Sequence, residues 1–526
     1  MTVYGIDFGT CYSCLAVAET GREPRVIPTA QGANTLPSVV EFRLNRNGTP
    51  RVGSIAKNAI TPLSRNVAAF LKTEMDHEIS TLSYEIRQGE FRQISPIEFA
   101  ACVYKELYTQ AQSQREANRQ DTTNKVVITV PAVCSEIQRE KTKVAAEQAG
   151  MEVIKIINEP TAAAISYNIA KGETIMVFDL GGGTHDVSIV QRLSGNNYQV
   201  IVTKGDPNLG GKYWDEKLVE LTYSKLGLNF TEDVLTHARL IEFEKHKINL
   251  CTSDDVTFAF MDDEGIQHQV TLELDEFEEF TENLVERAIS VARNAVEDAQ
   301  NYHPNVVIKR ICMSGGACRM QALKRALQRA FPRKTVSLND PDKSIATGAA
   351  IYALSLTENG NANYDIHVTE RGHAYGFKTF NSENCMPVIE NFINLRDPLE
   401  ITSRNIRKYM STSSKRQRLT VYENSENRSV YPWTGEKPFF DGDILFDHIR
   451  AVGSPLDIMF TRDANGVVSI VVNADNHKYE FSFATTSGSI SQEILENTKR
   501  LMELMEQINF KKNGLYFSNC SRFWLN

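Results

Sequence analysis

Two stretches of the sequence decide the fold that we predict: Gly5-Ile6-Asp7-Phe8-Gly9-Thr10 and Phe178-Asp179-Leu180-Gly181-Gly182-Gly183-Thr184. Each follows a strand-like run, and each passes from an aspartate through an apolar residue and glycine to a threonine. A turn of this kind that occurs twice predicts two similar subdomains that face each other across a cleft.

Both turns carry the groups that a polyphosphate–metal complex needs. Glycines let backbone N–H groups approach phosphate oxygens, and the threonine hydroxyl adds a donor. An aspartate at the end of a strand can hold Mg²⁺ directly or through its waters. Because turns of this kind are common, one alone is weak evidence for a phosphate site, but two matching turns favour it.

Two other nucleotide motifs are excluded by their spacing. A Walker A loop does not fit Gly205–Tyr213, which has one residue too many and no hydroxyl after Lys212. A dinucleotide fingerprint would need glycine where Asp186 stands.

The composition is that of a globular protein with a substantial core. The chain has 526 residues, 41% of them hydrophobic and 23% charged, which predicts about three domains. A net charge of −9 argues against nucleic-acid binding. We find neither a run long enough for a membrane helix nor a signal peptide, so we expect a cytoplasmic protein without membrane contact. Nine cysteines, an odd number, indicate reduced thiols.

Residues 1–357 alternate β-branched runs with helical patterns, which predicts an α/β architecture. We expect strands at 125–130, 175–179 and 310–314, and helices at 135–150, 273–300 and 321–330. The first of these helices ends at Gly150, which tolerates a left-handed backbone.

The pattern changes after residue 357. A polar, Asn-rich stretch at Glu358–Asn363 predicts a linker, and short alternating segments up to about Thr485 predict an all-β module. From Ser491 one amphipathic helix is expected, with an apolar face that comprises Ile494, Leu495, Leu501, Met502, Met505 and Ile508.

Five segments in one order resemble the signatures of the DnaK-type chaperones, the heat-shock protein 70 family. They are 5–10, Ile157–Ala164, 179–184, Ser314–Met320 and Asp340–Ala350, and together they cover nearly all of residues 1–357. The second half matches more loosely, at Gly453–Ile458 and Phe460–Gly466.

The resemblance implies an α/β, actin-like, two-lobed ATPase domain at 1–357, a linker at 358–373, a β-sandwich that binds peptides at 374–487, and a short helical remnant of the family's lid at 488–526. It also implies ATP or ADP and Mg²⁺ as ligands, with K⁺ as a further candidate ion. The implied partners are unfolded polypeptides, a J-domain co-chaperone and a nucleotide exchange factor.

Site residues are carried over by position. The implied catalytic residues are Lys72, Glu159, Asp179 and Thr184, and Asp7 and Asp179 would orient Mg²⁺ through its waters. The implied nucleotide-binding residues are Gly9, Thr10, Cys11, Tyr12, Gly181, Gly182, Gly183, Thr184, Gly211, Glu244, Lys247, Gly315, Gly316, Ala317, Arg319 and Asp342.

Simpler interpretations exist for several of these residues. From local sequence alone, Lys72 is a solvated lysine at the end of a helix, and Glu159 is a favourable carboxylate at a helix amino terminus beside Pro160. Glu244 and Lys247 also form an ordinary i, i+3 surface pair.

The chain departs from the family pattern near the nucleotide. Cys11 stands where the family has a second threonine, Ile248 and Cys251 replace an arginine and a serine beside the adenine, and Lys212 replaces an acidic residue. These changes predict weaker nucleotide binding. Cys11 and Cys14 form a C-x-x-C spacing that we interpret as two isolated thiols.

Peptide contacts are harder to assign. Alignment suggests Met386 and Ile389 on one cleft-lining segment, and Leu419 and Val421 on another. Leu419 and Val421 lie on one face of a strand, as a sandwich core also requires, and core packing is the favoured interpretation. Basic residues between Arg404 and Arg418 form either a solvated face or a site for acidic flanks of peptides.

The function that we expect is that of an ATP-dependent chaperone that binds extended hydrophobic segments, with Mg²⁺-dependent ATP hydrolysis modulating peptide affinity. One alternative is a nucleotide-binding co-chaperone or adaptor with little turnover. Cys11 favours it, and so does the linker, because the stretch Tyr364–Gly372 lacks the leucine run of the family and has Thr369 where the family has an aspartate. Another is a metabolic kinase on the same fold, which the all-β module opposes.

Overall fold

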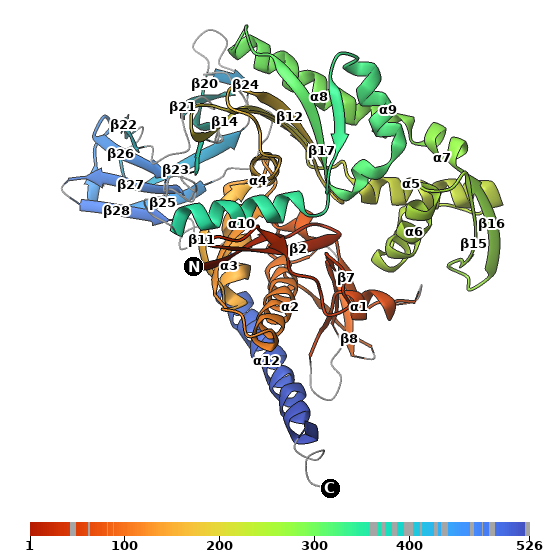
Figure 1. Ribbon diagram of the computed structural model, residues 1–526. Helices are drawn as coiled ribbons and strands as arrows, with labels where there is room; N and C mark the ends of the chain where they lie inside the picture. Colours follow the sequence, from red (N-terminus) through yellow and green to blue (C-terminus); the bar gives the residue numbers. More distant parts are fainter. Residues whose placement is uncertain are drawn as a thin grey trace. The chain divides into compact units, whose positions relative to one another are not determined.

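Figure 1 shows the ribbon of a computed structural model of the chain. The structure describes residues 1–42, 49–61, 64–80, 83–87, 89–357, 366–369, 374–380, 387–393, 403–410, 413–424, 430–432, 440–462, 468–475, 477–482 and 490–520. Two compact units make up the chain. Unit 1 comprises Met1–Val133, Thr142–Ile366 and Gln492–Asn526, and unit 2 comprises Cys134–Lys141 and His367–Ser491. The expected linker stretch Glu358–Asn363 lies outside the described residues.

The first large sheet of unit 1 has the strand order β11-β10-β1-β2-β3, with β4 paired to β2. Its strands are β1 (Thr2–Asp7), β2 (Tyr12–Glu19), β3 (Arg25–Val26), β4 (Leu36–Pro37), β10 (Lys125–Val130) and β11 (Glu152–Asn158). β1 pairs antiparallel with β2 and parallel with β10. The first glycine turn therefore joins two antiparallel neighbours in the middle of the sheet.

The second large sheet repeats this pattern, in the order β18-β17-β12-β13-β14-β19. Its strands are β12 (Thr174–Leu180), β13 (His185–Arg192), β14 (Asn196–Asp206), β17 (Ile308–Ser314), β18 (Thr335–Leu338) and β19 (Ile366–Thr369). β12 pairs antiparallel with β13 and parallel with β17. The second glycine turn thus occupies the same place in its sheet as the first.

Two helices pack tightly where glycines remove side chains. α10 (Ser344–Thr357) contacts β1 and α4 (Glu159–Ser166). A Cβ on Gly5 would lie 2.1 Å from the backbone nitrogen of Ala350, and one on Gly348 would lie 1.7 Å from the carbonyl oxygen of Ala162. Such distances admit no side chain, so glycine is what lets α10 approach both elements.

Smaller elements complete unit 1. Three short sheets contain β5 (Val39–Glu41), β6 (Arg51–Val52) and β7 (Val67–Ala69), β8 (Ser83–Arg87) and β9 (Glu90–Gln93), and β15 (Asp255–Met261) and β16 (Gln267–Glu273). The helices include α1 (Ser54–Asn58), α2 (Pro96–Ala117), α5 (Gly211–Leu226), α6 (His237–Leu250), α7 (Leu274–Phe280), α8 (Glu282–Tyr302) and α9 (Gln321–Ala330). Short 3₁₀ turns lie at Leu71–Glu74, Glu232–Val234 and Gly316–Arg319.

The carboxyl-terminal helix α12 (Gln492–Cys520) packs along α2 within unit 1 (Figure 1). Met502 and Met505 are buried, as the amphipathic pattern predicted. Lys105 on α2 is 7% exposed, and its Nζ donates to Oε1 of Glu506 on α12 at 2.5 Å. An apolar stripe and one ion pair therefore attach α12 to α2. The side chain of Ile508 lies outside the described ones.

Unit 2 contains two antiparallel sheets, in the orders β24-β21-β20-β23-β25 and β22-β26-β27-β28. Their strands are β20 (Ala374–Phe380), β21 (Pro387–Ile393), β22 (Ser403–Tyr409), β23 (Ser414–Asn424), β24 (Val430–Pro432), β25 (Phe440–Arg450), β26 (Pro455–Arg462), β27 (Val468–Ala474) and β28 (His477–Ser482). One apolar cluster combines side chains from both sheets, including Leu419 and Val421 from β23 and Ile458 from β26. The two sheets therefore enclose a single core.

Most predicted elements are present, with one correction. The strands at 125–130, 175–179 and 310–314 and the helix at 321–330 lie where the sequence placed them. The single helix predicted at 273–300 is wrong, because it is interrupted at Thr281. α7 ends at Phe280 and α8 begins at Glu282, and the Thr281 hydroxyl between them donates to the carbonyl oxygen of Phe277 at 2.8 Å.

Two further expectations from the sequence concern Gly150 and membrane-spanning helices. Gly150 has φ +95°, the positive value that the end of α3 (Glu136–Gln148) was expected to need. In the part of the chain that the structure describes, no helix is both long enough and apolar enough to cross a membrane.

Candidate active site

A cavity of about 380 Å³ lies in unit 1 between the two glycine turns. Its lining contains Asp7, Gly9, Thr10, Cys11, Tyr12, Lys72, Glu159, Asp179, Gly181, Gly182, Thr184, Gly211, Glu244, Lys247, Gly315, Gly316, Ala317, Arg319 and Asp342, together with Thr35, Ile248, Pro341 and Ile345. Every predicted nucleotide-binding and catalytic residue except Gly183 is therefore in the cavity wall.

The two turns are in direct contact at the cavity floor. A Cβ added to Gly182 would lie 2.3 Å from the Sγ of Cys11. One added to Gly183 would lie 2.9 Å from the Oγ1 of Thr10, and Gly210 packs against the Gly183 backbone. Gly183 thus lies behind the wall, where its lack of a side chain lets the turns meet.

Backbone bonds hold the second turn in shape. The amide of Gly181 donates to the carbonyl of Thr184 at 3.0 Å, and the amide of Gly211 donates to the carbonyl of Gly181 at 2.9 Å. Gly211 also begins α5. The amino end of this helix therefore meets the turn, and its partial positive charge favours an anion there.

Buried carboxylates gather beside Lys72. Nζ of Lys72 donates to Oε1 of Glu159 at 2.5 Å, and both side chains are less than 10% exposed. Burial, with the neighbouring Glu159 charge, raises the pKa of Asp7 to about 7 and that of Asp179 well above its usual value. Lys72 is therefore not the solvated residue that local sequence suggested, whereas Glu159 does begin α4 beside Pro160, in a buried position.

This cluster is short of positive charge. Asp186, which sequence reasoning did not select, is 1% exposed, and burial and Glu159 raise its pKa to about 7. Among the described residues, four carboxyl groups thus surround Lys72, an arrangement that an added divalent cation would stabilise. Among the described residues, no group of three His, Cys, Asp and Glu side chains could hold a metal ion directly. Carboxylates that act through metal-bound water fit this geometry.

Two buried ion pairs lie in another part of the cavity wall. Glu244 on α6 accepts from Nζ of Lys57 on α1 and from the hydroxyl of Tyr12, the latter at 3.4 Å. Lys247 donates to the Gly211 carbonyl at 2.7 Å and lies 2.7 Å from Oδ1 of Asp215. Glu244 and Lys247 are therefore not the exposed pair that the i, i+3 spacing permits.

Lys57 and Asp215 are supporting residues that the sequence analysis missed. Both partners come from other elements, α1 and α5, and only the folded chain brings them to α6. Arg319 pairs with Asp342 through two nitrogen–oxygen contacts of 2.7 Å, and both residues line the cavity. The fixed guanidinium leaves one flat face for a ring.

The residues at which the chain departs from the family pattern are not all in the cavity wall. Cys11 lines the cavity, and burial raises the pKa of its thiol, so it is held as the neutral thiol. Ile248 lines the cavity and is 49% exposed. Cys251 ends α6 outside the wall, and Cys14 is buried in β2.

The peptide candidates have a separate environment in unit 2. Leu419 and Val421 are 4% and 1% exposed in the core between the two sheets, and Ile389 is fully buried against Tyr422. Met386 lies outside the described residues. In the basic stretch, Arg416 pairs with Asp443 and Arg418 with Asp441.

The duplicated hairpins and the cavity between them define a nucleotide-binding protein built to hold a polyphosphate. The family model described as Hsp70 protein matches residues 3–372. A chaperone protein dnaK from Emiliania huxleyi is 30% identical over an alignment 545 positions long. The alignment covers 96% of this chain and 82% of that protein. The chain therefore belongs to the Hsp70 family.

Membership of this family makes the chain an ATP-dependent molecular chaperone and an ATPase. The adaptor alternative, with little ATP turnover, gains no support from either comparison.

Proposed function

We propose that ATP binds with its phosphates on the two glycine turns and that its hydrolysis controls the peptide affinity of unit 2. The observation that carries this proposal is the contact between the turns, where Gly182 meets Cys11. In this arrangement residues 1–357 form the actin-like, two-lobed ATPase domain, 358–373 the linker, 374–487 the peptide-binding sandwich, and 488–526 the remnant of the lid.

The phosphate end would use groups from both turns. Backbone amides of Gly9, Thr10, Cys11 and Gly181–Thr184 would bind phosphate oxygens. Tyr12, the next residue after the first turn, would also contact the nucleotide. Asp7 and Asp179 would hold Mg²⁺ through its waters. Bound Mg²⁺ neutralises charge on the phosphates. The excess of buried carboxyl groups supports such an ion, and Asp186 offers an oxygen for a second cation such as K⁺.

Hydrolysis would rest on positioning and charge. Lys72 would stabilise charge on the transferred phosphoryl group, and the Thr184 hydroxyl would bind one of its oxygens. Glu159 and Asp179 would orient the attacking water. The bond between Lys72 and Glu159 supports this division, because it holds both side chains next to each other in the wall of one cavity.

The nucleoside end would use the two buried ion pairs. Glu244 and Lys247 would bind the ribose hydroxyls beside Gly211. The base would lie against Gly315, Gly316 and Ala317, with Arg319 on one face and Ile248 on the other. Ile248 offers dispersion contact without charge, so weaker nucleotide binding than in relatives with a cation there remains our prediction.

Unit 2 would bind extended hydrophobic segments of unfolded polypeptides through main-chain hydrogen bonds and side-chain pockets. Met386 and Ile389 remain candidates for this contact, whereas the burial of Leu419 and Val421 supports core packing. A J-domain co-chaperone and a nucleotide exchange factor are the expected protein partners, and the cytoplasm is the expected compartment.

Single-turnover ATP hydrolysis tests the proposal. We expect an unfolded peptide to stimulate the wild type, and Lys72→Ala and Glu159→Ala each to lower the rate roughly 100-fold or more. Lys324→Ala, on α9 and outside the cavity wall, serves as the control. ATP binding without turnover would support the adaptor, and stimulation by a small acceptor but not by peptide would support a kinase.

A further inference from the structure

A second hollow, of about 270 Å³, lies apart from the nucleotide cavity. It forms where the start of β1, the end of β2 and the residues after α2 meet. Thr2, Thr20, Arg22, Arg119, Gln120 and Asp121 line it, together with Glu19. Hydroxyl, amide and guanidinium groups dominate this lining, so the hollow is suited to a polar ligand.

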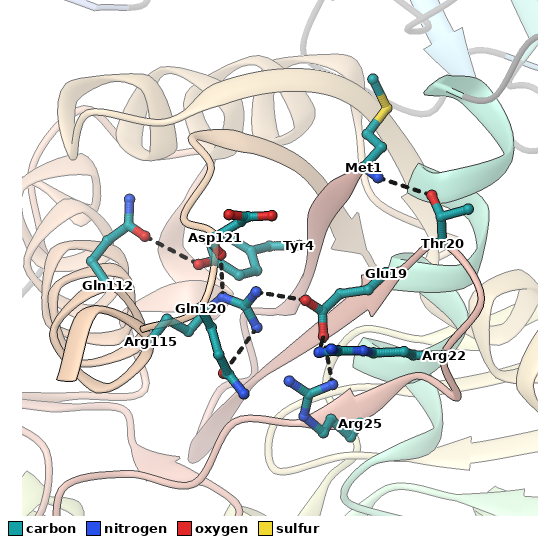
Figure 2. A network of polar contacts seen from close by, with 10 residues as sticks. All are labelled: Met1, Tyr4, Glu19, Thr20, Arg22, Arg25, Gln112, Arg115, Gln120 and Asp121. Carbon is teal, nitrogen blue, oxygen red and sulfur yellow. Dashed lines mark hydrogen bonds and ion pairs between the residues drawn. The ribbon is translucent and has the colours of Figure 1, made fainter. Parts of the chain in front are cut away.

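Glu19 is neutralised by three arginines, as Figure 2 shows. Arg115, 1% exposed, donates to Oε1 of Glu19 at 2.8 Å, and Arg25 donates to Oε2 at 2.8 Å. Burial alone would raise the pKa of Glu19, but these hydrogen bonds outweigh it and lower the pKa to about 2. The Glu19 carboxylate is therefore ionised and hydrogen-bonded to Arg115 and Arg25 through both of its oxygens. It offsets little of the positive charge on other residues around the hollow.

Arginine is in surplus around this hollow. Arg22 reaches Glu19 only at 3.4 Å, with 61% of its side chain exposed. Arg119 forms no ion pair with any residue that the structure describes. Two guanidinium groups thus border the hollow with unused donors, in a chain whose net charge is −9.

Arg119 occupies a position that favours glycine. Its φ is +55°, in the left-handed region. The amide of Gln120 donates to the Arg115 carbonyl at 2.8 Å and that of Arg119 to the Glu116 carbonyl at 3.0 Å, which closes the carboxyl end of α2. An arginine here is strained where glycine would not be, and Arg119 is one of the residues that line the hollow.

We propose that this hollow binds an oxyanion, a phosphoryl or carboxylate group, between Arg22 and Arg119. Guanidinium groups donate two parallel hydrogen bonds to either kind of anion. Thr20, whose hydroxyl accepts from the Met1 nitrogen at 2.9 Å, and Met1 itself also line the hollow. The volume exceeds that of a bare anion, so part of its carrier fits as well.

The negative charge of Asp121, which lines the hollow, would repel a bound anion. Its removal is therefore a control whose expected effect on affinity is opposite to that of removing Arg119. The backbone carbonyl of Asp121 accepts from Nε of Arg115 at 2.6 Å, while its side chain lines the hollow. Removing the Asp121 charge should therefore tighten anion binding, whereas removing the Arg119 charge should weaken it. A purely structural role for the cluster predicts neither change.

The test is calorimetric titration of inorganic phosphate and, separately, acetate. The protein is first saturated with Mg²⁺ and a non-hydrolysable ATP analogue, so that phosphate cannot enter the nucleotide cavity. The variants are Arg119→Ala, Arg119→Gly and Asp121→Asn, with Arg329→Ala on α9 as the matched surface control. Thermal unfolding of each variant without anion is measured in parallel.

We expect saturable binding that weakens roughly five- to tenfold in both Arg119 variants, tightens in Asp121→Asn and is unchanged in Arg329→Ala. Arg119→Gly should also unfold at a higher temperature than the wild type, because glycine relieves the left-handed strain. Binding of phosphate alone would assign a phosphoryl ligand, and binding of both anions a general oxyanion site. Equal affinities in wild type and Arg119→Gly, or no saturable binding of either anion, would overturn the proposal.

Discussion

Gly182 and Cys11, 171 positions apart in the sequence, meet so closely that a Cβ on Gly182 would lie 2.3 Å from the Cys11 sulfur. Gly182 belongs to the turn after β12, and Cys11 to the turn after β1. The contact joins the two halves of the nucleotide cavity. Both turns must therefore keep their backbone positions for the cavity to exist.

Gly182→Ala should separate the turns. The added methyl group clashes with Cys11, so we expect a loss of about 1–3 kcal/mol in the free energy of unfolding. Gly181→Ala is the matched control, because a Cβ there would lie 3.6 Å from its nearest neighbour, the Thr184 carbonyl oxygen. Denaturant unfolding without nucleotide measures both. Equal stability of the two variants would contradict this account of the contact.

Lys57→Met should speed the release of nucleotide. The change leaves the buried Glu244 with the Tyr12 hydroxyl as its remaining hydrogen-bond partner among the residues that the structure describes, and breaking such an ion pair is unfavourable. We expect the α1–α6 contact to open more often and a fluorescent ADP analogue to dissociate roughly tenfold faster. Lys245→Met, one position after Glu244 on the exposed side of α6, should leave the dissociation rate unchanged. A slower or unaltered rate in Lys57→Met would count against this role.

The nucleotide-free protein should lose stability as the pH rises from about 4 to about 7. Asp7 has a pKa near 7 when folded and near 3.8 when unfolded, so over this range the folded state binds more protons. Stability from Asp7 is fully present below pH 4 and is lost as the pH passes 7. In Asp7→Asn this contribution is absent. The stability difference between variant and wild type should therefore grow with pH and level off above 7, as urea unfolding at several pH values can show.

Glu506→Ala should loosen α12. The variant removes the carboxylate partner of Lys105, a buried cation whose other hydrogen bond within the described part of the chain is to the Ala149 carbonyl, at 3.4 Å. We expect faster amide hydrogen exchange along α12 and little change in the two large sheets. Glu503→Ala, also exposed on α12, controls for helix propensity. Identical exchange in the two variants would show that the Lys105 bond does not attach the helix.

Much of the site was readable from local sequence because glycine turns are local structures. The spacing of Asp, Gly and Thr in each turn reflects what a phosphate-binding backbone requires over a few residues, and its duplication indicated a cleft. Gly150 was readable for the same reason, since the end of a helix is determined by its neighbours. The break at Thr281 was missed because the helical pattern continues on both sides of it.

Tertiary structure alone decided which charges are paired. Glu244 and Lys247 have a spacing that equally permits a solvated surface pair, and their burial depends on Lys57 and Asp215 from other elements. Lys72 and Glu159 are likewise joined only by the fold. Long-range pairing of this kind leaves no periodic signal in the sequence, because each partner satisfies its own local pattern whether or not the other is near.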